Sequence, residues 1–264
     1  MARGKRILKR IIYGSAILLL GLMAALACYR LFRPQHFAAT YHHLLATYLV
    51  DHESDYASAK SHWLAALAAR PDHAVAHNNL AKILQENFGD FEAARRHYLL
   101  ALNSDSSLVS PRNNLAMLLE SRFQDYDGAQ KYYREALALD PNHVLINRNY
   151  AVFLAYTKHD TTNAEPYFLK ALALQSDNAN SQLYYARFLE DFLHKYDQAR
   201  SHYVKALEIN RYHADVHLDF AYLLLDHFQD STLAREHYLK ACKLKPPARN
   251  AQTDVLFGIR TAVK

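Results

Sequence analysis

The chain has 264 residues, of which 51% are hydrophobic and 22% are charged, and it contains six glycines. Its formal net charge of +5 is uneven: residues 1–33 hold seven Lys or Arg and no acid, so the remainder, with 24 basic and 26 acidic residues, is close to neutral. The basic character of the N-terminus therefore gives no support to a nucleic-acid-binding surface. The chain has few glycines, no Gly-rich phosphate loop and no G-x-S-x-G turn, and this argues against an enzyme. We therefore expect neither catalytic residues nor a cofactor.

Residues 11–28 form an uncharged, apolar run behind the basic residues 1–10. At about 1.5 Å per residue, a helix of this length nearly matches a hydrocarbon core about 30 Å thick. Five basic residues precede the run and two follow it closely, so the positive-inside rule places residues 1–10 in the cytosol and the rest on the non-cytosolic side, the periplasm in a bacterium. We therefore expect a single-pass membrane protein with an uncleaved transmembrane helix, followed by a linker at 29–36.

Two alternatives to an uncleaved anchor remain open. The sequence Ala25-Leu26-Ala27 has the A-x-A pattern of a signal-peptide cleavage site, and Cys28 directly after it suggests lipidation. Against lipidation, Ala25 occupies the position where a bacterial lipobox usually has leucine. Arg30 and Arg33, just beyond the site, do not favour export of a cleaved chain.

Six copies of a 35-residue unit occupy residues 37–245. In each copy an alanine is followed four residues later by an aromatic ring and three residues after that by another alanine. In the second copy, Ala94, Tyr98, Ala101 and Leu102 stand at i, i+4, i+7 and i+8, which is one face of a helix. A second register, which includes Leu80, Ala81 and Leu84, indicates another helix before it. The packing aromatics are Trp63, Tyr98, Tyr133, Phe168, Tyr203 and Tyr238.

A polar turn separates the two helices of each unit. Five of the six turns place an aspartate where its side chain can accept from the free amides of the following helix: Asp55, Asp90, Asp125, Asp160 and Asp230. Each unit is therefore predicted to be a helix, a turn and a helix. Because neither helix can bury its apolar stripe alone, the units must stack.

This pattern resembles the tetratricopeptide repeat family, over roughly four-fifths of the chain. The resemblance rests on the small residue after a large apolar one in the first helix, on Ala-x3-aromatic in the second, and on the closing prolines Pro71, Pro141 and Pro246. This chain departs from the usual pattern by one extra residue per unit, in the turn between the helices. It also has alanine in place of the usual glycine of the first helix, and it lacks the early tryptophan, which is replaced by His42, His77, Arg112, Asn147, Gln182 and His217.

The resemblance implies an all-α, right-handed superhelical solenoid whose first helices line a concave groove for an extended polypeptide. Residues two before the first-helix alanine are expected to face this groove. Three successive asparagines there are similar to the asparagine ladder with which some family members grip a peptide backbone. The predicted groove residues, including neighbours of the ladder, are Asn78, Asn79, Asn113, Asn114, Arg148, Asn149, Tyr184, Arg187, Asp219 and Tyr222.

The remaining features are interpreted as structural. Four of the sixteen histidines recur at the repeat period, in a slot that tyrosine fills elsewhere, and none shows a tight metal-ligand spacing, so we expect no metal site. Residues 246–264 contain an apolar helical pattern that is expected to cap the last repeat. The predicted function is a non-catalytic, membrane-anchored scaffold or adaptor for a protein partner, with no small-molecule substrate. The alternative is a structural subunit that docks through its convex face or its membrane helix.

Overall fold

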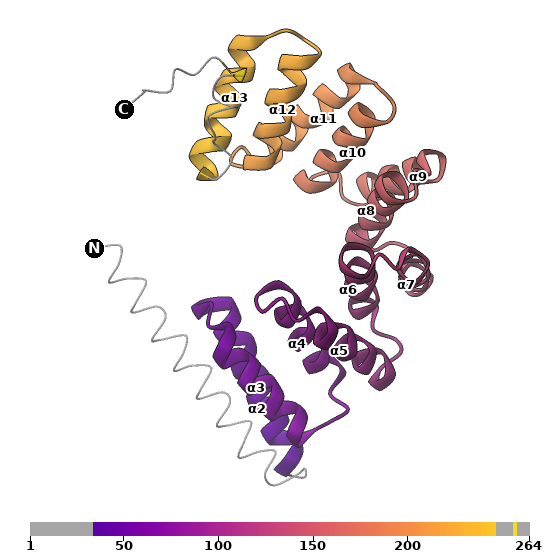
Figure 1. Cartoon of the computed structure of the whole chain (residues 1–264), viewed down its shortest axis with the longest axis vertical. Helices are drawn as coiled ribbons and strands as arrows, with labels where there is room; N and C mark the ends of the chain where they lie inside the picture. The colour runs from indigo at the N-terminus through magenta and orange to yellow at the C-terminus, as the bar shows by residue number, and fades with distance from the viewer. Residues whose placement is uncertain (1–33, 247–255, 258–264) are drawn as a thin grey trace, which may run out of the picture. The chain divides into compact units, whose positions relative to one another are not determined.

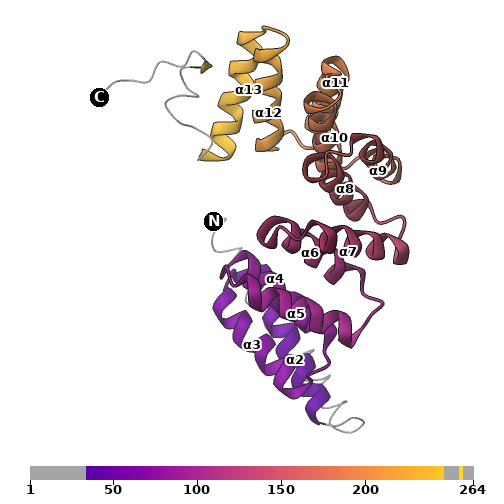
Figure 2. The same cartoon turned by 45° about the vertical axis from the view of Figure 1, so that its right-hand side comes forward.

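The computed structural model describes residues 34–246 and 256–257. Every regular element in these residues is a helix. The chain forms two compact units, the first ending at Leu139 and the second beginning at Asp140, and each unit contains three helical hairpins (Figures 1 and 2).

In the first unit, the first helices of the three hairpins are α2, α4 and α6, and the second helices are α3, α5 and α7. Two of the first helices end in a π-helical turn, η1 or η2. The bounds are α2 Pro34–Tyr48, η1 Leu49–Glu53, α3 Tyr56–Ala69, α4 Ala74–Glu86, α5 Phe91–Ser104, α6 Val109–Leu118, η2 Leu119–Phe123 and α7 Tyr126–Leu139.

The second unit repeats this arrangement, with α8, α10 and α12 as first helices and α9, α11 and α13 as second helices. Figure 1 shows α12 and α13 side by side as one such hairpin. The bounds are α8 Val144–Val152, η3 Phe153–Thr157, α9 Thr161–Leu174, α10 Ala179–Asp191, α11 Tyr196–Ile209, α12 Ala214–Asp226 and α13 Ser231–Leu244.

The periodic alanines and rings form the core, as the sequence predicts. The eighteen recurring alanines, three in each repeat, are completely buried, and the six packing aromatics are at most 2% exposed. In three of the four repeats where the ring is tyrosine, its hydroxyl donates to a side chain thirteen residues earlier; Tyr238 has Leu225 at that position. Tyr98 donates to Gln85 at 3.2 Å and Tyr203 to Glu190 at 2.8 Å, whereas Phe168, which has no hydroxyl, has Ala155 at the corresponding position.

The turn within each repeat accommodates the extra residue of the 35-residue period. The residue before the capping position has a left-handed backbone in all six repeats, with φ between 51° and 65°. The next amide then donates to the carbonyl six residues earlier, as Asp90 N–H does to Leu84 O at 2.9 Å. The five predicted aspartate caps are confirmed, since each accepts from the amide three residues later at 2.9–3.2 Å.

The residues that replace the family's early tryptophan hold the turn between successive repeats. In five repeats this side chain donates to the backbone carbonyl six residues earlier, at 2.8–3.0 Å. Histidine, arginine, asparagine and glutamine can all make this bond, because each offers a nitrogen donor at similar reach. This explains why the position varies in residue type yet stays polar.

Among residues 34–246 and 256–257, no helix combines the length and the apolar character needed to cross a bilayer. The predicted transmembrane helix at 11–28 lies outside the described residues, as does most of the predicted cap at 246–264.

Candidate functional site

In the first unit, four of the predicted groove residues form one chain of amide hydrogen bonds. Asn78 donates from Nδ2 to Oδ1 of Asn79 at 3.1 Å, and Asn114 donates to Oδ1 of Asn78 at 3.2 Å. Asn113 donates to Oδ1 of Asn114 at 3.3 Å. The chain therefore joins α4 to α6 and links two successive repeats.

These four amides differ in what they can offer a ligand. Asn78, Asn79 and Asn114 are half-buried, but Asn113 is only 3% exposed, so its main effect is to orient Asn114. Each amide nitrogen has two hydrogens and each amide oxygen two lone pairs, so the internal bonds use only part of their capacity. Asn79 and Asn114 retain both donor and acceptor positions for a polypeptide backbone.

A hollow of about 310 Å³ lies beside Asn79. Residues of α2, η1, α3 and α4 line it. Three of them, Asp51, Lys82 and Glu86, were not among the predicted groove residues. Lys82 and Glu86 follow Asn79 by three and seven residues on the same helix, so they share its face. Both residues could have been identified from the sequence by adding to each predicted asparagine position the residues three and seven places later, which share its helix face.

In the second unit, two arginines converge on one tyrosine. The guanidinium carbons of Arg148 on α8 and Arg187 on α10 lie 5.2 and 5.3 Å from the ring centroid of Tyr184. Arg148 also donates to Oδ1 of Asn149 at 3.2 Å, while its Nε is buried with no hydrogen-bond partner. Burial lowers the pKa of Arg148. Among the residues that the structure describes, no carboxylate pairs with this arginine, so it presents a positive charge on the first-helix face.

Arg187, in contrast, already has a carboxylate partner. Its Nε donates to Oδ2 of Asp219 on α12 at 2.5 Å. Burial raises the pKa of Asp219 and Arg187 opposes that effect, while hydrogen bonding to Asp219 raises the pKa of Arg187 against its own burial. This pair links α10 to α12 and leaves Arg148 as the group available to an acidic ligand.

Two further acidic residues, Glu190 and Asp191, lie at the end of α10. Tyr156 donates from its hydroxyl to Oδ2 of Asp191 at 2.6 Å. Burial raises the pKa of Glu190 to about 7, even though the Tyr203 hydroxyl donates to this carboxylate. Tyr156 and Asp191, seven residues after Asn149 and Tyr184, were missed in the sequence, although the same i+7 rule points to them.

Tyr222 is separate from this cluster. Its ring lies 5.3 Å from the ring of Phe257, which also stacks on Tyr238 at 4.3 Å. Phe257 is 4% exposed and therefore covers the apolar surface that the last repeat would otherwise present to a following one. Any ligand that reaches Tyr222 must share it with Phe257.

The recurring histidines, which the sequence analysis interprets as structural, make specific hydrogen bonds. Their ring nitrogens pair with residues twenty positions earlier: His62 with His42, His97 with His77, His202 with Gln182 and His237 with His217, at 2.6–2.9 Å. Within the described residues, no group of three or more His, Cys, Asp or Glu side chains is placed to hold a metal ion.

Comparison with known proteins bears on this repeat architecture. The profile of the tetratricopeptide repeat family matches residues 43–111 and 114–180, which is 69 and 67 of the 264 residues, or just over half of the chain. No curated protein sequence matches the chain.

Several solved structures have a similar fold. PilF of Pseudomonas aeruginosa aligns at 24% identity with a TM-score of 0.66, over 81% of this chain and 95% of that one. The type IV pilus biogenesis factor PilW aligns at 21% identity with a TM-score of 0.70, over 83% and 98%. A chain of the APC/C hetero-tetramer Cut9–Hcn1 aligns at 19% identity with a TM-score of 0.73, over 90% and 45%.

At these identities the likenesses concern the fold. The profile match and the six hairpins, with alanines and rings at the family's positions, agree on one conclusion: the chain belongs to the tetratricopeptide repeat family.

Proposed function

We propose that this protein is a non-catalytic adaptor that binds an extended polypeptide along the faces of its first helices. The observation that carries the proposal is the amide chain of Asn78, Asn79, Asn113 and Asn114, beside the hollow at Asn79. Amide side chains both donate and accept, so they can pair with a main chain of any sequence. Orientation by their neighbours lowers the entropy lost when they bind.

The second unit adds side-chain recognition to this backbone recognition. Arg148 offers a charge that no carboxylate of the described part of the chain pairs with, and Tyr184 offers a ring that two guanidinium groups contact. A carboxylate on the bound polypeptide would form a charge-assisted hydrogen bond with Arg148. The preferred partner is therefore an extended segment that carries an acidic residue.

The test is a crosslinking pulldown of the full-length protein beside a variant with Asn79, Asn114 and Asn149 changed to alanine. A matched control changes the exposed second-helix residues Leu64, Leu99 and Leu169 to serine. We expect the asparagine variant to lose its partners and the leucine variant to keep them, with the helical circular dichroism of both unchanged. Partners that survive the asparagine substitutions would contradict the proposal.

We further propose that residues 11–28 remain as an uncleaved anchor, with the repeats on the non-cytosolic side. A tether raises the local concentration of a captured partner at the membrane. The protein should stay in the membrane fraction after carbonate extraction, and its intact mass should include residues 1–28. A mature chain that begins after Ala27 would instead establish cleavage or lipidation.

One observation favours a second candidate, a structural subunit that docks through its outer face. Exposed aliphatic side chains recur at the repeat period on the second helices, at Leu64, Leu99, Leu169, Val204 and Leu239, with Arg134 as the exception. In the pulldown above, this candidate predicts the opposite result: the leucine variant loses the partners and the asparagine variant keeps them.

A further inference from the structure

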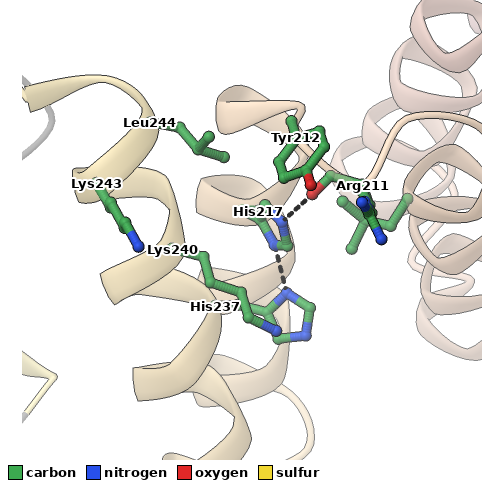
Figure 3. Close-up of a pocket in the computed structure, with 8 residues that line it drawn as sticks. Arg211, Tyr212, His217, His237, Lys240, Lys243 and Leu244 are labelled. Atoms are coloured by element: carbon green, nitrogen blue, oxygen red, sulfur yellow. Dashed lines mark hydrogen bonds between the residues drawn. The ribbon is translucent and has the colours of Figure 1, made fainter.

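A cavity of about 470 Å³ opens at the last hairpin of the second unit, away from the proposed polypeptide-binding residues. Figure 3 shows Arg211 and Tyr212 on one side, Lys243 and Leu244 on the other, and His217 and His237 between them. The full lining is Leu207, Arg211, Tyr212, His217, His237, Lys240, Lys243 and Leu244.

The charges around this cavity are of one sign and partly uncompensated. Lys240 is paired with Glu236 at 2.6 Å. Arg211 stacks on the ring of Tyr212, with its guanidinium carbon 4.7 Å from the centroid, and within the described residues neither Arg211 nor Lys243 has an acidic partner. Two cations at the mouth are therefore available to an anion.

The two imidazoles add no charge at neutral pH. His217 donates from Nε2 to the carbonyl of Arg211 at 3.0 Å, and in its neutral form its Nδ1 then accepts from Nδ1 of His237, 2.8 Å away (Figure 3). This arrangement places one proton between two neutral rings. Burial lowers the pKa of His217 and lowers that of His237 to about 4. The rings therefore form part of an otherwise apolar wall with Leu207, Tyr212 and Leu244.

The repeat itself does not require these cations. The positions of Arg211, Lys240 and Lys243 hold Ser176, Lys205 and Glu208 one repeat earlier, and Pro71, Leu100 and Asn103 in the second repeat. In none of the six copies except the last are all three basic. The same hairpin forms with serine, proline or leucine at these places, so the repeat fold does not account for the concentration of charge at the last hairpin.

We propose that this cavity binds a small amphipathic anion, an alkyl or aryl carboxylate in the simplest case. The apolar body would lie on Leu207, Tyr212 and Leu244, and the carboxylate between Arg211 and Lys243. A volume of a few hundred cubic ångströms, lined by apolar groups with a few polar ones, is typical of small-molecule sites. The chain's own residues 247–264 are a poor match, since they carry three basic side chains and one acidic one.

The test is a calorimetric titration of the full-length protein with octanoate at pH 7.5. We expect saturable 1:1 binding that weakens about tenfold or more in the Arg211→Gln/Lys243→Gln double variant, because charge-assisted hydrogen bonds to the carboxylate are lost. Lys205→Gln, at the place of Lys240 one repeat earlier, is the matched control and should bind as the unmodified protein does. Binding should also raise the pKa of His237, measured by NMR, because a nearby anion favours the imidazolium form.

Three results would overturn the proposal. The first is a titration in which octanoate shows no saturable binding to the full-length protein, whatever else the cavity binds. Equal affinity for the double variant means that the cations take no part. Equal binding of octyltrimethylammonium means that the cavity attracts any alkyl chain. A Leu244→Asp variant, which places a negative charge at the exposed wall, provides an independent check and should abolish octanoate binding.

Discussion

In each turn one residue has a left-handed backbone conformation, which costs free energy for any residue other than glycine. Gly89 occupies this position in one repeat, but Ser54, Gln124, His159, His194 and Gln229 occupy it in the others. A side chain with a Cβ is less stable than glycine in this region of the backbone by about 1–2 kcal/mol, offset in part by the greater freedom of glycine in the unfolded chain.

We therefore expect Gln124→Gly to stabilise the protein by roughly 0.5–1 kcal/mol, seen as a higher urea midpoint. Gln124 is exposed, so its side chain contributes little packing. Gly89→Ala is the reciprocal change and should destabilise the protein, since an added Cβ at that site meets nothing within 4 Å and only the backbone conformation is penalised. A Gln124→Gly variant with an unchanged or lower midpoint would contradict this account of the turn.

Residue identity alone did not reveal several of these features. The aspartate caps and buried alanines were predictable because they recur at fixed positions with one residue type. The positive φ was not, because glycine marks it in one repeat of six. The ion pair of Arg187 with Asp219 joins residues 32 positions apart, which meet only when α10 packs beside α12.

At the scale of the helix, one missing cap stands out. Lys195 occupies the N-cap position of α11, where five other repeats have aspartate, and its side chain accepts no amide hydrogen bond. The lysine also places a positive charge at the positive end of the helix dipole. Its ion pair with Glu165, at 3.8 Å, is partly exposed and contributes little.

Lys195→Asp should therefore stabilise the protein by about 1 kcal/mol. The measurement is thermal unfolding, with Lys195→Ala as the control, because alanine removes the ion pair without adding a cap. If the alanine variant gains as much as the aspartate variant, the gain comes from removing the lysine charge and not from capping.

Helix pairs and their order could be predicted because the 35-residue period is visible in six copies. The π-helical ends η1, η2 and η3 could not, since the extra residue signals only that some turn must be longer. Asn79, which spacing along α4 assigns to the first-helix face, borders a hollow. The burial of Asn113 depends on how α6 packs against its neighbours, and spacing along one helix does not determine that.

For the molecule as a whole, the paired histidines make stability depend on pH. Burial lowers the pKa of nine histidines below 6.5, and to about 4 for His73, His97, His202 and His237. Between these pH values the unfolded chain binds more protons than the folded one. The stabilisation of the fold by these neutral histidines is therefore complete above about pH 6.5 and is lost as the pH falls toward 4. Glu190 and Asp219, whose pKa values are raised, act in the opposite sense but are fewer.

We expect the melting temperature to fall between pH 7.5 and pH 5. The double variant His77→Asn/His97→Tyr, which copies the residues Asn147 and Tyr167 found two repeats later, should show a smaller fall because two titrating groups are removed. A melting temperature that does not change with pH, or a fall equal in both proteins, would show that the imidazole pairs do not control acid stability.

The central claim is that the first-helix face holds the partner, and site-specific photocrosslinking in intact cells tests it most directly. A photoreactive phenylalanine replaces Met117 on α6 or Leu99 on α5, two side chains that are similarly exposed at 40% and 43%. Met117 lies one turn beyond Asn114, on the proposed binding face. The account predicts a crosslinked polypeptide from position 117 and none from position 99, whereas crosslinks from position 99 alone would contradict it and favour docking through the outer face.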